Sequence, residues 1–134
     1  MNPSEPDKPK AFLAYGSESP ARSETLESAA EGIGASGVTE VLSWRGLNAG
    51  GTLLVSSICE AIHKCSIFIA DVSTLNNNVL FELGFAIALK KRIWLLLDES
   101  VPQCRNDFDR YQLLSTVGYC GYTNSTGVIK KLGR

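Results

Sequence analysis

The feature that most constrains the fold is a set of short, continuously apolar segments separated by longer segments with helical spacing. Residues 66–70 and 92–97 contain such apolar runs, and residues 10–15 contain a third. Strands that are apolar on both faces are usually buried on both faces, as in parallel sheets covered by helices. The intervening segments have the length and spacing of helices. The sequence therefore predicts an α/β protein built on a parallel sheet.

The alternation predicts five strands joined by helices. The strands are expected at residues 10–15, 39–44, 66–70, 92–97 and 117–121. Helices are expected at residues 21–35, 52–64, 79–89 and 108–114, with the start of another at the end of the chain and an irregular polar connection over residues 98–107. Five such strands suit a flavodoxin-like three-layer sandwich with the strand order 2-1-3-4-5 and helices on both faces.

Length and composition indicate one globular domain. The 134 residues are 44% hydrophobic and 20% charged, with a net charge of -1. We expect residues 1–9, which are rich in proline and charge, to form a flexible tail, and residues 10–134 to form a single domain. The abrupt end of the chain suggests a domain cut from, or assembling with, something larger.

Charge and hydropathy also limit the partners and the compartment. A balanced charge shows no electrostatic footprint for nucleic acid or an anionic membrane, and no apolar stretch is long enough to span a bilayer. The four cysteines form no CxxC pair, and His63 is the only histidine. We therefore expect no metal site and no disulfide framework. Without a recognisable signal peptide, a cytoplasmic protein is the expectation.

The strand order and a single carboxylate select the same candidate site. In such sheets ligands bind where the strand order reverses, here beside the loops at residues 16–19 and 71–78. The second loop leads into a helix that is apolar almost all the way round and contains one ionisable side chain, Glu82. A lone carboxylate is costly to bury unless something pairs with it or function requires it. Asn78 lies four residues earlier and therefore shares its helix face.

The chain resembles the Toll/interleukin-1 receptor (TIR) domain in its bacterial TIR-like form, and more distantly the nucleoside 2-deoxyribosyltransferases. The resemblance runs from about residue 10 to residue 122. It rests on residues 11–17 (Ala-Phe-Leu-Ala-Tyr-Gly-Ser), on residues 46–51 leading into 58–62, and on Ile-Ala-Asp at 69–71 followed by Asn-Val-Leu-Phe-Glu-Leu-Gly at 78–84.

The resemblance implies an enzyme that acts on N-glycosidic bonds. Enzymatic members of both families carry an essential glutamate on the helix after strand three, which corresponds to Glu82. The leading hypothesis is a NAD glycohydrolase, with NAD as substrate, no cofactor and no metal. The nicotinamide of NAD is cationic while it is bonded to the ribose, and it leaves as a neutral molecule. The role left for the carboxylate is to stabilise the ribosyl cation and to bond the ribose hydroxyls. The candidate substrate contacts are Phe12, Tyr15, Gly16, Ser17, Trp44, Arg45, Asp71 and Asn78.

Each candidate has a structural alternative. Glu82 can pair with Arg45, Lys90 or Arg92, and Asp71 can cap the turn after its strand. Tyr15 and Trp44 can serve as packing residues, Arg45 as a solvated loop charge, and Asn78 as a helix cap. Trp44 and Arg45 stand where TIR domains often have an acidic residue, and Asn78 stands near a position that is aromatic or Cys in many NAD-cleaving members.

Three functions are carried forward. The first is the NAD glycohydrolase, with or without cyclisation of the ADP-ribose. The second is a nucleoside 2-deoxyribosyltransferase-like enzyme in which Glu82 attacks the sugar. The third is a non-catalytic TIR module that binds partners or senses a nucleotide. The resemblance further implies an effector in bacterial defence that self-associates through TIR–TIR contacts and works beside a sensor domain or protein. A receiver domain is excluded, because it needs an acidic pair where this chain has residues 15–17.

Overall fold

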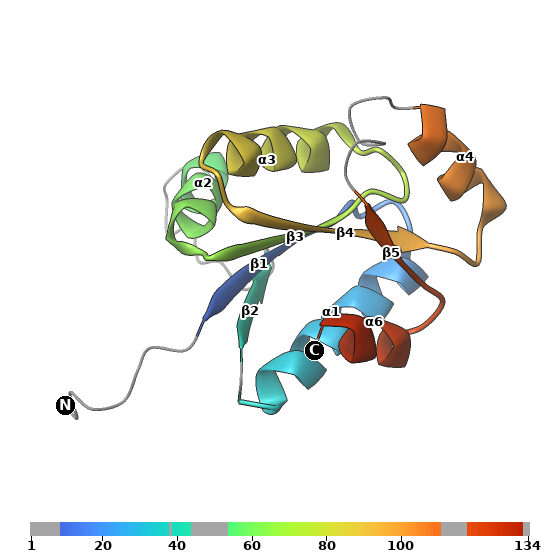
Figure 1. Cartoon of the computed structure of the whole chain (residues 1–134), viewed down its shortest axis with the longest axis horizontal. Helices are drawn as coiled ribbons and strands as arrows, with labels where there is room; N and C mark the ends of the chain where they lie inside the picture. Colours follow the sequence, from blue (N-terminus) through green and yellow to red (C-terminus); the bar gives the residue numbers. More distant parts are fainter. Residues whose placement is uncertain (1–8, 38, 44–53, 111–117, 133–134) are drawn as a thin grey trace.

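The computed structural model describes residues 9–37, 39–43, 54–110 and 118–132. Along the chain, strands alternate with helices throughout these ranges (Figure 1). The strands are β1 (Lys10–Ala14), β2 (Glu40–Ser43), β3 (Ile67–Asp71), β4 (Arg92–Asp98) and β5 (Tyr119–Tyr122). The helices are α1 (Pro20–Ala35), α2 (Leu54–Lys64), α3 (Asn77–Ala88), α4 (Pro102–Arg110) and α6 (Ser125–Leu132).

The five strands form one parallel sheet with the order β2-β1-β3-β4-β5. β1 lies between β2 and β3, so that Phe12 is in register with Leu42 on one side and with Phe68 on the other. β3 pairs in turn with β4, and β4 with β5. This is the flavodoxin-like order that the sequence predicts, and the prediction is confirmed. The strand order reverses between β1 and β3, because β2 is added on one side of β1 and the later strands are added on the other.

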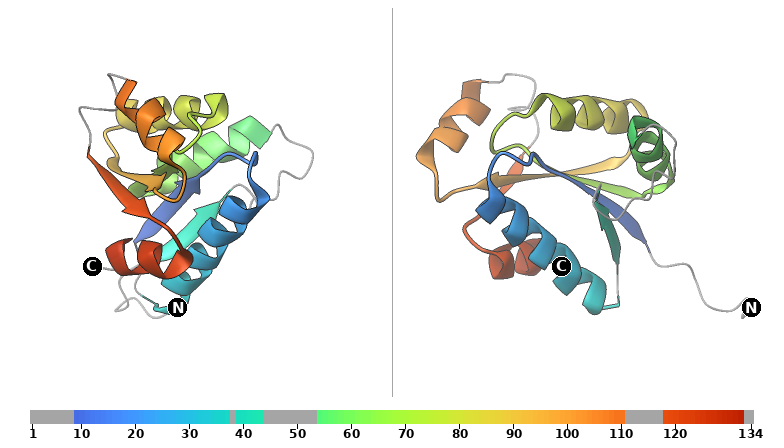
Figure 2. Two further views of the ribbon diagram at one scale, coloured as in Figure 1. Left: turned by 90° about the vertical axis from the view of Figure 1, so that its right-hand side faces the viewer. Right: turned by 180° about the vertical axis from the view of Figure 1, so that it is seen from behind.

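Helices cover both faces of the sheet. Helices α1 and α6 lie on one face, and α2, α3 and α4 lie on the other (Figure 2). Alternate strand residues supply two separate cores: Phe12, Phe68 and Leu95 pack towards α2 and α3, whereas Leu13, Ile69 and Leu96 pack towards α1. The strands are buried on both faces, which is why they appear as continuous apolar runs in the sequence.

The C-terminal third corrects the sequence-based expectations. The segment expected to be irregular up to residue 107 contains α4, which begins at Pro102, and the helix expected at residues 108–114 is described only to Arg110. Pro102 suits a first helical turn, and Cys104 and Phe108, four residues apart, bury one side of the helix. The fifth strand begins at Tyr119 rather than at residue 117, which lies outside the described residues.

Other expectations fall partly outside the described residues. The tail expected at residues 1–9 is described only at Pro9.

None of the described helices is long and apolar enough to cross a membrane. All four cysteines are free thiols, and the described residues contain no group of three His, Cys, Asp or Glu side chains that would suit a metal ion.

Candidate functional site

A cleft of about 360 Å³ lies beyond the carboxyl ends of β1 and β3, where the strand order reverses. This is the position at which open α/β sheets bind their ligands. The volume is at the lower end of the range for small-molecule sites. The described residues that line the cleft come from two loops and two helices: Tyr15, Gly16, Ser17, Val55, Ile58, Asn76, Asn78, Phe81 and Glu82.

The first turn of α3 brings its polar side chains to the cleft. Asn76 is the N-cap, and its Oδ1 accepts hydrogen bonds from the backbone N of Asn78 at 2.8 Å and of Val79 at 3.2 Å. These bonds satisfy two amide groups that a helix start otherwise leaves unpaired. Asn78 therefore lies inside the helix, one turn before Glu82, and both side chains line the cleft.

Glu82 is half-buried, and burial raises the pKa of its carboxyl group to about 7. The ion pairs within the described ranges join other residues, so neither Lys90 nor Arg92 pairs with Glu82. Arg92 instead lies over the Trp94 ring, 5.5 Å from its centroid. Arg45, the third partner considered, lies outside the described residues. The structural ion pair with Lys90 or Arg92 is therefore not formed, and the carboxylate faces the cleft without a cation from these two residues.

The lining of the cleft is part polar and part apolar. We call the lining residues Gly16, Ser17, Asn76 and Asn78 the polar wall, and Val55, Ile58 and Phe81 the apolar wall. Phe81 is 57% exposed and Val55 is 49% exposed, which is unusual for large apolar side chains in this chain. An exposed aromatic ring beside a carboxylate is a surface on which a flat, partly apolar ligand can pack.

Tyr15 lines the cleft, and a contact with α1 holds its side chain in place. Its ring is buried, and its hydroxyl donates a hydrogen bond to the carboxylate of Glu27 on α1. Ser43, at the end of β2, donates to the same Glu27 oxygen at 2.7 Å. Glu27 thereby ties the ends of β1 and β2 to α1 and fixes the Tyr15 ring at the edge of the sheet.

The structure brings together some of the predicted site residues and separates others. Tyr15, Gly16, Ser17, Asn78 and Glu82 all line the one cleft. Trp44 and Arg45, which were also predicted to contact substrate, lie outside the described residues.

The structure contradicts the expectation that Phe12 contacts substrate. It is 1% exposed and stacks on Phe68 inside the core, with ring centroids 6.1 Å apart. A ring packed between strand and helices is unavailable to a base in the cleft. Its position in the middle of β1 explains the placement, because a central strand of a covered sheet is buried on both faces.

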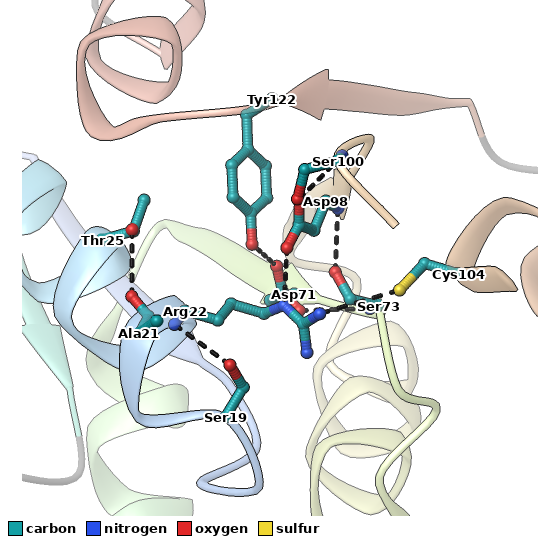
Figure 3. A network of polar contacts seen from close by, with 10 residues as sticks. All are labelled: Ser19, Ala21, Arg22, Thr25, Asp71, Ser73, Asp98, Ser100, Cys104 and Tyr122. Carbon is teal, nitrogen blue, oxygen red and sulfur yellow. Dashed lines mark hydrogen bonds and ion pairs between the residues drawn. The ribbon is translucent and has the colours of Figure 1, made fainter. Parts of the chain in front are cut away.

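Asp71 also departs from the substrate-binding expectation. It is 4% exposed, and its carboxylate accepts hydrogen bonds from the Tyr122 hydroxyl and from the Ser73 backbone N (Figure 3). The bond to Ser73 is the turn-capping role that was the alternative for this residue. Burial raises the pKa of Asp71, although its hydrogen bonds act in the opposite direction.

Asp71 belongs to a polar network at the carboxyl ends of β3, β4 and β5 (Figure 3). Arg22 on α1 pairs with Asp98 at 3.1 Å, and Ser73 Oγ accepts a hydrogen bond from the Asp98 backbone N at 2.9 Å. Burial opposes ionisation of Asp98, but hydrogen bonds from Ser100 and Arg22 outweigh it and lower the pKa of that carboxyl group. The network holds the start of the β3–α3 loop, and so it supports the cleft without lining it.

The sequence reasoning missed the apolar wall. Val55 and Ile58 come from α2, and Phe81 comes from α3, and none of the three was among the predicted substrate contacts. The available signal was the spacing of Phe81 from Asn78, three residues earlier, because residues three apart share a helix face. Asn76 was not among the predicted substrate contacts, and it both caps α3 and lines the cleft.

No known protein family and no curated protein matches the sequence. Solved structures do match. A CMP N-glycosidase of Clostridium botulinum, BcmB, is 25% identical over 92% of this chain and 97% of its own, with a TM-score of 0.67. The TIR domains of the activated Roq1 resistosome, which recognises the pathogen effector XopQ, are 10% identical over 93% of this chain and 97% of theirs, with a TM-score of 0.68. The chain therefore has a TIR-like fold.

Proposed function

We propose that this protein hydrolyses the N-glycosidic bond of a nucleotide, with Glu82 as the catalytic carboxylate. The observation that carries the proposal is a half-buried carboxylate, without an ion-pair partner at Lys90 or Arg92, in a cleft at the strand-order reversal. The likeness to a CMP N-glycosidase over nearly the full length of both chains supports the same class of reaction.

The proposed chemistry uses Glu82 and water and calls for no cofactor. As the bond between C1′ and the base nitrogen breaks, positive charge develops on the ribose ring, and the carboxylate stabilises it. Water then adds to C1′, and its proton passes by way of the carboxylate to the departing base. Alternatively, Glu82 first forms a covalent ribosyl ester that water hydrolyses, with the same proton reaching the base. The products are the free base and ribose carrying the rest of the nucleotide.

A nucleoside 5′-monophosphate is the substrate we favour. A cleft of about 360 Å³ suits a mononucleotide better than a dinucleotide. We place the base against the apolar wall of Val55, Ile58 and Phe81, and the ribose and phosphate against the amides and hydroxyls of the polar wall. This orientation leaves C1′ beside Glu82, which lies between the two walls on α3.

NAD, the substrate of the leading hypothesis in the sequence analysis, is the second candidate here. Glu82 is the one carboxylate among the described residues that line the cleft. A cationic nicotinamide leaves as a neutral molecule without protonation, whereas a pyrimidine benefits from a proton donor. A single carboxylate therefore suits nicotinamide release, with or without cyclisation of the ADP-ribose.

Self-association and a role in bacterial defence belong to the same proposal. Ile87 is 45% exposed on α3, and the neighbouring outward positions Gly84 and Ala88 are also exposed and uncharged. An apolar helix face of this kind suits contact between copies, brought together by a sensor domain or protein. Specific activity that rises with protein concentration, together with assembly seen by light scattering, would support it. Concentration-independent activity of a monomer would contradict it.

The deciding experiment incubates the protein with CMP, other nucleoside monophosphates, NAD and deoxynucleosides, and follows release of the free base by chromatography. Wild type is compared with Glu82→Gln, which keeps the shape of the side chain and removes its charge. We expect base release from a nucleotide by wild type only. Base exchange between deoxynucleosides would favour a deoxyribosyltransferase. No turnover of any substrate at high protein concentration would favour a non-catalytic module.

A further inference from the structure

The two loops that line the cleft are joined by a side-chain contact that the proposed chemistry does not use. Nδ2 of Asn76 donates a hydrogen bond to Oε1 of Glu18. Glu18 follows Gly16 and Ser17 in the loop between β1 and α1, and Asn76 precedes Asn78 at the start of α3. The contact therefore connects the two loops whose residues form the polar wall of the cleft.

The amide of Asn76 has separate tasks at its two ends. Its oxygen caps α3 by accepting from the backbone N of Asn78 and Val79, while its nitrogen donates to Glu18 in the β1–α1 loop. Because the amide group is planar and rigid, its oxygen and its nitrogen cannot move independently of each other. Because Glu82 lies on the next turn of the same helix, the place of Glu18 is coupled to the place of the catalytic carboxylate.

Two features of the loops accompany this contact. The Glu18 carboxylate lies over Gly16, where a Cβ would meet the end of a side chain that can move aside. Leu75, immediately before Asn76, has φ of +49°, a left-handed conformation that costs a non-glycine residue free energy. The β3–α3 loop therefore keeps an unfavourable conformation because its neighbours hold it there.

We propose that Glu18 and Asn76 are positioning residues whose contact sets the separation of the two cleft loops. The contact fixes the Glu82 carboxylate relative to a ribose held by Gly16 and Ser17. This inference rests on the proposed function for its effect on catalysis. The coupling between residues 18 and 76 is a property of the folded chain and can be measured independently of any activity.

The test is an exchange of hydrogen-bond roles. Asn76→Asp keeps the helix cap, because aspartate caps as well as asparagine, but it places a second carboxylate against Glu18. We expect kcat/KM for the nucleotide to fall about tenfold because the two carboxylates repel each other and separate the loops. Adding Glu18→Gln supplies an amide that donates to the new carboxylate, and we expect kcat/KM to return to within about threefold of wild type.

The matched control adds Glu24→Gln to Asn76→Asp instead. Glu24 is an exposed glutamate on α1, so this double variant has the same net charge without the restored contact. We expect it to stay as slow as Asn76→Asp alone. Equal rescue by Glu24→Gln, or no rescue by Glu18→Gln, would overturn the proposal.

Urea unfolding of the same variants separates this inference from the proposed function. A double-mutant cycle at residues 18 and 76 is expected to show coupling, whereas a cycle at residues 24 and 76 shows none. Zero coupling at 18 and 76 would overturn the positioning contact, whatever the activity. Lack of nucleotide hydrolysis by wild type would contradict the proposed function instead, and the unfolding cycle would then decide the contact.

Discussion

Replacing Glu82 by glutamine is expected to abolish hydrolysis and, at the same time, to stabilise the fold above neutral pH. The two effects have one cause. Glu82 is half-buried, and no ion pair to Lys90 or Arg92 supports its charge. Its ionised form is therefore costly in the native state. For the same reason neither cation neutralises the carboxylate, which is available for catalysis. Glutamine has nearly the same shape, carries no charge and cannot stabilise a ribosyl cation.

The magnitude follows from the pKa of Glu82. In the native protein the pKa is about 7, compared with 4.5 for the free side chain, a difference of about 2.5 pH units. At 1.36 kcal/mol per unit this sets an upper bound of about 3.4 kcal/mol. Water in the open cleft screens part of this cost, so we expect about 2 kcal/mol, or about 7 °C in Tm for a domain of this size.

The sign is set by proton binding. Between pH 4.5 and about 7 the native state binds more protons at Glu82 than the unfolded state does. The contribution of this residue to the free energy of unfolding is therefore full below pH 4.5 and is lost as the pH rises towards 7. The Glu82→Gln variant has no such loss. Its stability relative to wild type should rise over this interval and level off above it.

The assay is urea unfolding of wild type, Glu82→Gln and Glu24→Gln at several pH values from 4 to 8.5. We expect the difference between Glu82→Gln and wild type to grow by about 2 kcal/mol with pH, while Glu24→Gln stays parallel to wild type. The kcat/KM of wild type should rise with pH and inflect near 7, as the carboxylate forms. A constant difference, or a Glu82→Gln variant that becomes less stable at high pH, would refute this reasoning.

Three further substitutions test other parts of the account. Phe81→Ala is expected to raise KM about tenfold through lost stacking on the base, whereas Val101→Ala, at an exposed apolar residue outside the cleft, leaves KM unchanged; equal effects in a steady-state assay would argue against the apolar wall. Tyr122→Phe removes a donor to buried Asp71 and should cost about 1–2 kcal/mol in urea unfolding, and an unaltered midpoint would contradict the bond. Arg22→Met should cost about 1–3 kcal/mol at pH 7, and this cost should shrink below pH 3.8 as Asp98 becomes protonated; a cost that does not change with pH would exclude the ion pair as its source.

Much of the architecture follows from the sequence alone. Strands such as β3 and β4 are apolar on both faces, and that pattern has few solutions other than a covered parallel sheet. The strand-order rule then places the ligand site beside β1 and β3, and the single carboxylate on α3 lies there. The helix boundaries do not follow from the sequence in the same way, because Pro102 begins a helix in a stretch whose polarity resembles that of a loop.

The details of the site depended on tertiary contacts that periodicity does not encode. Phe12 and Tyr15 are three residues apart and both are buried, yet only Tyr15, which follows the end of β1, also lines the cleft. Asp71 ends a strand beside the cleft, and its carboxylate turns to Tyr122, a residue 51 positions away. Long-range partners of this kind become visible only when the sheet is assembled.

The most direct test of the central claim follows the glycosidic bond itself. Proton NMR of the nucleotide during incubation reports H1′ of the intact substrate and the anomeric protons of the released sugar. The account predicts that wild type converts the first signal into the second and that Glu82→Gln leaves the substrate spectrum unchanged. Conversion at the same rate by both proteins, or by neither, would contradict the role assigned to Glu82.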